Sequence, residues 1–592
     1  MSGRGEHPVA VVTGGGGGIG AAIATELGRR GTVVVIVDPL VAVDGSPVGA
    51  SDEPSGPSTA ERIVAGGGRA QASGASVTDI DAVRELFGDL VTEHGRLDAV
   101  VNVAGIARPT GFASGSDDDW AAVLWVHLDG YRNVLDAALP LMAEAGSGRI
   151  VGVTSGSGWR PADAGAYSCA KRAVASLTWQ LGAAAPPGVA VNAISPIALT
   201  RMVTAALARA TRGPSPGGAA GGPSLGGLSL GGMASPESLG PLGAHLASVG
   251  ATSLRGQILF AGGSEVALVR PPRLIEVVRT PRSADAARVV DAVIGSWIAA
   301  EARQASTGGA NPRFGGLYDP VASVASVGSV VSTAADGPHG PDGPDGFDGF
   351  DGPAHRVLVV GDAAHAPPLR ASLERLGAAV QIAPPPPDTG IAALRTLLGR
   401  ADAHLGGIDA VIVDSAIVDS AIVDSAIVDS GNGAGNANAT WATILADHDG
   451  LSGRIAHDAR WARTVAEHAS TTGRPVRLVT LVDAASPSGR TRAQAAAQLA
   501  RAGSGATEGR VTAVAVSVED RAQGPAVAAL AALLALDERA VGLGGAELAV
   551  GSGWIGLRAH PTPAGSLVFG GPEIPPWFDD ALREIAGVEA AP

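Results

Sequence analysis

Short β-branched runs alternate with longer helical patterns along the first 270 residues, and this alternation constrains the fold more than any other feature. Strands bounded by turn residues are expected at 8–14, 32–38, 97–105, 148–156, 188–195 and 256–263. Helical patterns begin near Ile19, Asp79, Asp117 and Ala166. Strands that are continuously apolar are typical of parallel sheets covered on both faces. The pattern therefore predicts a doubly wound α/β fold.

The alternation resumes in the second half of the chain. Strands are expected there at 355–362, 378–384, 408–414, 474–483, 510–518 and 545–553. The chain has 592 residues, of which 46% are hydrophobic, so it is long enough for two cores. We therefore expect two doubly wound, parallel-sheet domains in tandem, at 1–275 and 355–592, with a connecting segment at 276–354.

Three segments are expected to be irregular. Gly, Ser and Pro dominate a lid insertion at 205–235 and a linker at 336–353, and such compositions do not build a core. The stretch VIVDSAIVDSAIVDSAIVDS at 411–430 repeats a five-residue unit. An odd period changes the face that each copy presents on a strand. One copy is therefore expected to be the strand and the rest a loop.

Composition and charge exclude several classes of protein. A formal net charge of -15 gives no basic surface for nucleic acid. The first residues lack a signal-type apolar region, and the longest clean apolar run, 526–536, is too short for a bilayer. The single cysteine, Cys169, cannot form an internal disulfide. We expect a cytoplasmic protein without a nucleic-acid partner, a membrane partner or a metal.

The stretch TGGGGGIG at 13–20 follows an expected strand and opens an expected helix. Its glycines allow backbone N–H groups to reach a pyrophosphate at the helix N-terminus. A low-complexity run is the alternative in a chain with 85 glycines, but the flanking elements favour the cradle. Asp38 ends the next strand, where a carboxylate can bind a ribose diol and repel a 2′-phosphate. This favours NAD over NADP, unless Asp38 only begins a turn with Pro39.

Tyr167 and Lys171 stand four positions apart and share one face of an expected helix. Lys171 is the only lysine among the 42 lysine and arginine residues of the chain. A nearby ammonium lowers the pKa of a phenol from its usual value of about 10, because it favours the phenolate. Lysine is a compact point charge, whereas arginine is a planar fork. The pair therefore predicts an acid/base group that works at neutral pH.

Ser155 ends an expected strand at the carboxyl edge of the sheet, where doubly wound folds bind ligands. Its hydroxyl can donate to a carbonyl oxygen on which negative charge develops. Ser157 or Thr154 could fill this role instead, and most serines in loops only cap or turn.

Together the stretches 13–20, NVAG at 102–105, Ser155, YSCAK at 167–171 and NAISPIALT at 192–200 resemble the short-chain dehydrogenase/reductase family. The resemblance covers most of residues 7–270. It implies a Rossmann-type subunit that interconverts a secondary alcohol and a ketone with NAD(P), with Tyr167 as acid/base, Lys171 as the cation that tunes it and holds the nicotinamide ribose, and Ser155 orienting the carbonyl. The implied cofactor contacts are Thr13, Gly14, Gly18, Ile19, Gly20, Asp38, Ser76, Val77, Asn102, Ala104, Gly105, Tyr167, Lys171, Pro196 and Thr200.

The sequence departs from the family pattern at His127, where the family usually has an asparagine in its proton relay. Histidine can also donate and accept hydrogen bonds through its two nitrogens, so His127 is a candidate for this relay. The alternative is that His127 only packs in a helix interface with its hydrogen bonds satisfied there. SVTD at 76–79, VHLDG at 126–130 and VGSGWIG at 550–556 are similar to 3-hydroxyacyl-CoA dehydrogenases, some of which carry two such domains. This implies either an acyl thioester or a simpler alcohol or ketone as substrate.

The second half cannot use the same chemistry, because all three tyrosines and the only lysine precede residue 319. We interpret it as a degenerate, non-catalytic copy that is the partner of the first half in an intramolecular pseudo-dimer, with a homo-oligomer also open. The alternative is a module that binds a ligand or regulator. For the whole chain, the alternative is a catalytically silent cofactor-binding or scaffold protein of dehydrogenase ancestry.

Overall fold

A computed structural model describes residues 6–48, 56–204, 234–248, 250–251, 254–280, 286–304, 355–361, 367–387, 389–414 and 440–587. Most of the lid expected at 205–235, the linker at 336–353 and the repeat copies after Asp414 lie outside these residues.

The first sheet has the strand order β17-β8-β7-β6-β5-β4-β1-β2-β3 among the described residues. Neighbours from β3 to β7 pair in parallel, whereas β8 and β17 are antiparallel additions. The strands are β1 (Val9–Thr13), β2 (Val33–Val37), β3 (Arg69–Ser73), β4 (Ala99–Asn102), β5 (Gly148–Val153), β6 (Val189–Pro196), β7 (Ile258–Gly262), β8 (Glu265–Arg270) and β17 (Thr562–Val568). The central strands are fully buried, as their apolar sequences require.

Helices cover both faces of this sheet. Side chains of α1 (Gly18–Arg29), α2 (Thr59–Ala65) and α8 (Gly240–Leu246) form the core on one face, with α19 (Phe578–Ala586) from the end of the chain. The other face packs against α3 (Ile80–His94), α5 (Gly130–Ala145) and α6 (Gly165–Ala184). Between α4 (Asp117–Leu124) and α5, residues Trp125–Asp129 form one π-helical turn, labelled η1.

The second sheet has the order β11-β10-β12-β13-β14-β15-β16-β9 among the described residues. Its strands are β9 (Leu274–Arg279), β10 (Arg356–Val360), β11 (Ala379–Ala383), β12 (Ala410–Asp414), β13 (Val476–Asp483), β14 (Val511–Val518), β15 (Glu547–Gly551) and β16 (Trp554–Arg558). The helices of this part of the chain are α9 (Ala286–Ala302), α12 (Pro367–Arg375), α13 (Ile391–Leu405), α15 (Trp441–Asp447), α16 (Leu451–Thr472), α17 (Pro487–Ala506) and α18 (Gly524–Leu536). Of these, α15 packs its buried side chains into the core of the first sheet. Two doubly wound α/β sheets in tandem are therefore confirmed.

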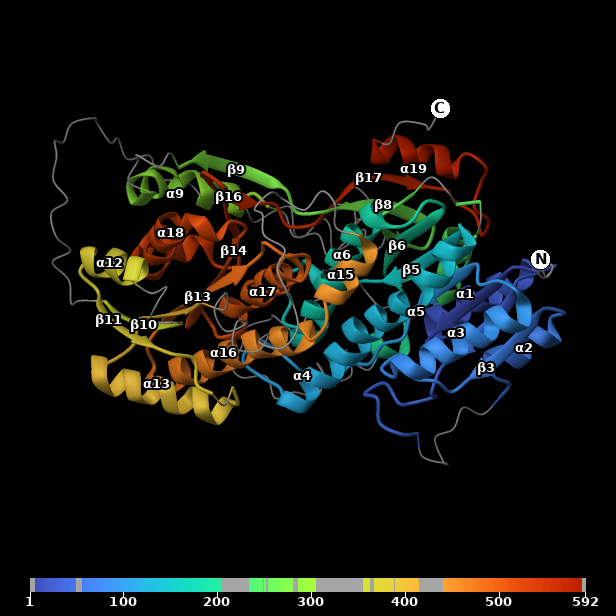
Figure 1. Cartoon of the computed structure of the whole chain (residues 1–592), viewed down its shortest axis with the longest axis horizontal. Coiled ribbons are helices and arrows are strands. Elements are labelled where there is room, and N and C mark those ends of the chain that lie inside the picture. The colour runs from blue at the N-terminus through green and yellow to red at the C-terminus, as the bar shows by residue number, and fades with distance from the viewer. Residues whose placement is uncertain are drawn as a thin grey trace, which may run out of the picture.

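The two sheets exchange their outermost strands. After β8 the chain crosses to the second sheet, where β9 pairs with β16, and after β16 it returns to the first sheet, where β17 pairs with β8 (Figure 1). The second sheet otherwise repeats the order of the first without a counterpart of β3. Each sheet is thus completed by a strand from the other part of the chain, while the domain boundaries expected near 275 and 355 stay predictions.

The two halves also share a core made by helices. α4 and α6 of the first half pack against α16 and α17 of the second, and their side chains belong to one continuous apolar cluster. Because α6 carries Tyr167 and Lys171, the second half packs directly against the helix that bears the candidate catalytic residues.

Among the described residues, no helix combines the length and apolar character needed to cross a membrane. The same residues contain no group of three or more His, Cys, Asp or Glu side chains placed to hold a metal ion.

Candidate active site

The glycine stretch forms the turn from β1 into α1. Gly14 has φ 66°, and a Cβ there would lie 2.8 Å from the backbone nitrogen of Ala104, so only glycine fits. Gly18 has φ 54°, and a Cβ at Gly20 would collide with the carbonyl of Gly14. Gly17, the N-cap of α1, provides no side-chain cap for the first N–H groups of the helix. The turn therefore has the close-packed backbone and free helix N-terminus that a pyrophosphate requires.

Asp38 lies beside this turn, at the end of β2. Its carboxylate accepts hydrogen bonds from the backbone nitrogens of Gly16 at 2.9 Å and Leu40 at 2.8 Å. This position is compatible with both roles considered for Asp38, the start of a turn and the binding of a ribose diol.

The end of β4 is tied to the glycine turn. The Thr13 hydroxyl donates to the Asn102 side-chain oxygen at 2.7 Å, and the Ala104 backbone nitrogen donates back to that hydroxyl at 3.3 Å. Gly105 packs closely against His127. A Cβ at this position would collide with the imidazole ring. Ile19 packs against the core next to this turn.

Two further predicted segments lie at the same edge of the sheet. The carbonyl of buried Val77 accepts a hydrogen bond from the Asn133 side chain at 3.0 Å. The Ser76 and Thr78 hydroxyls are hydrogen-bonded to each other. Pro196 ends β6, and the Thr200 methyl group lies 4.0 Å from where a Cβ of Gly18 would be.

The structure brings Tyr167, Lys171 and Ser155 together at the end of β5. Both ring and amine lie on α6, and the Lys171 Nζ is 5.6 Å from the centre of the Tyr167 ring. Lys171 donates to the Val153 carbonyl at 2.7 Å, which anchors it at the end of β5. The Ser155 hydroxyl lies near the Tyr167 phenol and acts to lower its pKa. Thr154, an alternative to Ser155, instead donates to the carbonyl of Lys171 at 2.6 Å.

Burial is the largest influence on the pKa values of this cluster. Burial raises the pKa of Tyr167, outweighing the Ser155 hydroxyl and the charge of Arg160, both of which favour the phenolate. Burial also lowers the pKa of Lys171 to about 7. Desolvation therefore opposes the charged form of both groups, and the lowering of the Tyr167 pKa that we expected from Lys171 stays a prediction.

His127 lies on the π-helical turn and meets the Tyr167 ring edge-on, with centroids 5.1 Å apart and planes at 87°. Its Nε2 is within 2.8 Å of the Ile106 carbonyl, and its Nδ1 has no hydrogen-bond partner among the described residues. Burial, and secondarily the charge of Lys171, lower its pKa to about 3. The imidazole is therefore neutral at physiological pH.

The sequence analysis did not identify two arginines that lie at the site. Arg160 follows Ser155 in the segment before α6, and its charge acts on Tyr167. The Arg201 guanidinium lies over the glycine turn, 2.9 Å from where a Cβ of Gly17 would be. Arg201 directly follows the recognised stretch 192–200, so its position was a usable signal, whereas nothing local marked Arg160.

Comparisons with known proteins agree with this geometry. A family model described as short chain dehydrogenase matches residues 8–211. The short-chain reductase protein NovJ of Streptomyces niveus is 36% identical over 192 residues, 32% of this chain and 69% of that protein. Hydroxyacyl-CoA dehydrogenase ChsB1 of Mycobacterium tuberculosis is 34% identical over 278 residues, 45% of this chain and 80% of that protein. The peroxisomal hydratase-dehydrogenase-epimerase of Neurospora crassa is 30% identical over 305 residues, 50% of this chain and 30% of that protein.

One solved structure matches both halves. The N-domain of bacterial malonyl-CoA reductase, solved with NADP, aligns over 90% of this chain and 95% of its own, with a TM-score of 0.60 and 17% identity. At that identity the match shows the tandem fold alone. From the family match and the relatives, the chain belongs to the short-chain dehydrogenase family and is an oxidoreductase that acts on CH–OH groups with NAD(P).

Proposed function

We propose that the first half interconverts a secondary alcohol and a ketone, with Tyr167 as the acid/base. The observation that carries the proposal is the convergence of Tyr167, Lys171 and Ser155 at the end of β5. A phenol and a hydroxyl that lie next to each other can both reach one substrate oxygen.

The glycine turn and its neighbours fit a dinucleotide. Gly14, Gly18 and Gly20 would hold the pyrophosphate at the start of α1, together with the Arg201 guanidinium. Thr13, Asn102 and Asp38 would hold the adenosine side, and the segment from Pro196 to Thr200 the nicotinamide. When bound, the cofactor supplies the hydride acceptor or donor. The Asp38 carboxylate favours NAD over NADP, because it repels a 2′-phosphate, and kcat/KM measured with each cofactor checks this preference.

The chain's own residues handle the proton. During alcohol oxidation the Tyr167 phenolate oxygen takes the hydroxyl proton of the substrate, and during ketone reduction the phenol returns it. The Ser155 hydroxyl donates to the same substrate oxygen and stabilises the negative charge that develops there. Lys171 would hold the nicotinamide ribose and contributes positive charge in its protonated fraction. Neutral His127 is a candidate for passing the proton onward from this cluster.

We propose a 3-hydroxyacyl thioester as the substrate class. The names of two relatives, a hydroxyacyl-CoA dehydrogenase and a hydratase-dehydrogenase-epimerase, support this choice. The second half would be a non-catalytic partner, since it contains no tyrosine or lysine after residue 318.

Turnover by the wild type and by Tyr167→Phe tests the proposal. NADH consumption with acetoacetyl-CoA, or with a panel of simple ketones, is expected for the wild type, and a loss of about a thousandfold or more for Tyr167→Phe, which keeps the ring but has no proton to exchange. Binding of NADH without turnover on any substrate would favour the silent-scaffold alternative, and an active Tyr167→Phe variant would refute the role of the phenol.

A further inference from the structure

The segment that links Ser155 to Tyr167 is held by the second half of the chain. Gln498 on α17 is 1% exposed, and its Nε2 donates to the backbone carbonyls of Ser157 at 3.0 Å and Arg160 at 2.8 Å. Both carbonyls lie more than 330 positions away in the sequence. One side chain of the second half therefore bridges the two ends of the turn that follows Ser155.

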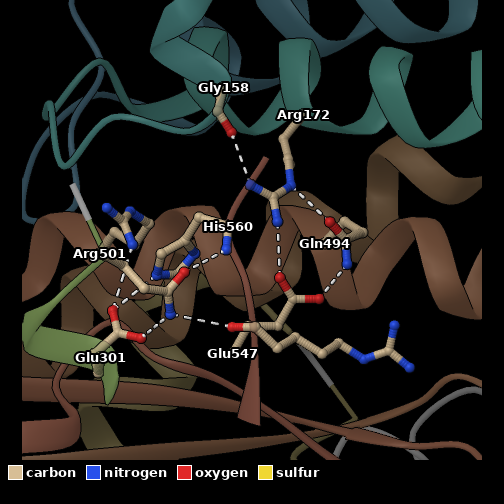
Figure 2. Close-up of polar contacts among 9 residues, drawn as sticks. Gly158, Arg172, Glu301, Gln494, Arg501, Glu547 and His560 are labelled. Carbon is tan, nitrogen blue, oxygen red and sulfur yellow. Dashed lines mark hydrogen bonds and ion pairs between the residues drawn. The ribbon is translucent and has the colours of Figure 1, made fainter. Parts of the chain in front are cut away.

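A second contact reaches the same turn from Arg172, the residue after Lys171. Arg172 is fully buried, and its guanidinium donates to Glu547 at 2.7 Å, to Gln494 at 2.7 Å and to the Gly158 carbonyl at 3.4 Å. Figure 2 shows this guanidinium between the turn and the second half, next to a cluster in which Glu301 accepts from His560 and pairs with Arg501. Arg172 thus links the turn to β15 and α17 of the second half.

The turn has little structure of its own. Gly156–Gly158 is a single 3-10 turn, and its two glycines add backbone freedom that must be lost when Ser155 is fixed. Ser155 and Arg160, at its two ends, are also the groups that act on the phenol of Tyr167. The hydrogen bonds that Gln498 and Arg172 donate to this turn therefore help to determine the positions of Ser155 and Arg160.

We propose that the second half acts as a positioning partner of the active site, with Gln498 as the positioning residue that fixes the Ser155–Arg160 turn against Tyr167. This rests on the proposed roles of Tyr167 and Ser155. It assigns the second half a role in turnover that packing alone does not require.

The test compares Gln498→Met with Gln180→Met in the full-length protein. Methionine keeps the length of the side chain but loses both donors to the turn. Gln180 is the matched control, because its Nε2 also crosses the interface, to the Pro487 carbonyl at 3.2 Å and Thr491 at 2.9 Å, without touching the turn. We expect Gln498→Met to lose kcat by roughly tenfold to a hundredfold, with unchanged NADH affinity, because small misplacements of catalytic groups are costly. Gln180→Met is expected to keep kcat.

Hydrogen exchange of the peptide covering 155–166 gives a readout that does not need a substrate. Faster exchange in Gln498→Met than in Gln180→Met supports the proposal, and equal exchange together with equal kcat overturns it. If Gln498→Met does not fold, Gln498→Asn, whose shorter amide cannot span both carbonyls, replaces it with the same measurements. An active Tyr167→Phe variant would instead remove the proposed function, while the exchange result would still decide whether Gln498 orders the turn.

Discussion

At the scale of single residues, two cations lie near one phenol, and only one of them could be identified from the sequence. Lys171 was marked by its spacing from Tyr167 and by being the only lysine. Arg160 was not, because its effect depends on how the turn before α6 folds back. In the structure the charge of Arg160 favours the phenolate, while burial lowers the pKa of both Arg160 and Lys171.

Arg160→Gln should shift the pH dependence of alcohol oxidation to higher pH. Oxidation needs the phenolate, so the rate rises as pH passes the pKa of Tyr167, and removing the positive charge of Arg160 raises that pKa further. The measurement is kcat/KM against pH. Arg84→Gln, which changes an exposed arginine on α3, should leave the profile unchanged. A profile unaffected by Arg160→Gln would show that the phenol is not the titrating group.

At the scale of elements, sequence patterns located the strands whose two faces are buried. All six strands expected in the first half and all six in the second are present. The strands without a predicted counterpart lie at or near the sheet edges. β3 has the polar sequence RAQAS, and β17 contains proline and glycine, so neither shows a continuous apolar run. Their pairing is decided by distant partners that no local pattern reveals.

The π-helical turn is another feature that periodicity could not resolve. The sequence shows a helical pattern that begins near Asp117, and the structure has α4, η1 and α5 in continuous succession there. A π turn adds one residue per turn and is common at functional sites. Here it is the element that carries His127 to the Tyr167 ring.

Glu547→Gln should strongly destabilise the protein, because it leaves the buried charge of Arg172 without a carboxylate. Glu547 and Arg172 side chains are 1% and 0% exposed, and breaking such a pair by removing one partner costs about 3–5 kcal/mol. The same substitution at Glu467, whose pair with Arg395 is half exposed, should cost about 0–1 kcal/mol. Thermal unfolding of both variants checks this, and equal melting temperatures would contradict it.

At the scale of the whole molecule, neither half is complete by itself. The first sheet needs β17 along β8, and α4 and α6 need α16 and α17 to cover their apolar faces. The sequence indicated a second half without the catalytic pair, but it gave no sign that the halves exchange strands.

Residues 1–330 expressed alone should therefore self-associate or aggregate and lose activity. The exposed edge of β8 and the uncovered face of α6 are the physical cause. Size-exclusion chromatography with light scattering, and NADH turnover, measure the outcome. As a control, a protease site placed within 336–353 and cut after folding should leave both halves associated and active. A fully active, monomeric 1–330 fragment would refute the dependence.

The crossing of β9 and β17 also sets an order of events during synthesis. β8 ends at Arg270, whereas the strand that covers its edge begins only at Thr562. At a translation rate of about 5–20 residues per second, the ribosome needs on the order of tens of seconds to deliver that strand. Throughout this interval the nascent first half carries an open, apolar sheet edge, so the growing chain has a period in which chaperones are most useful to it.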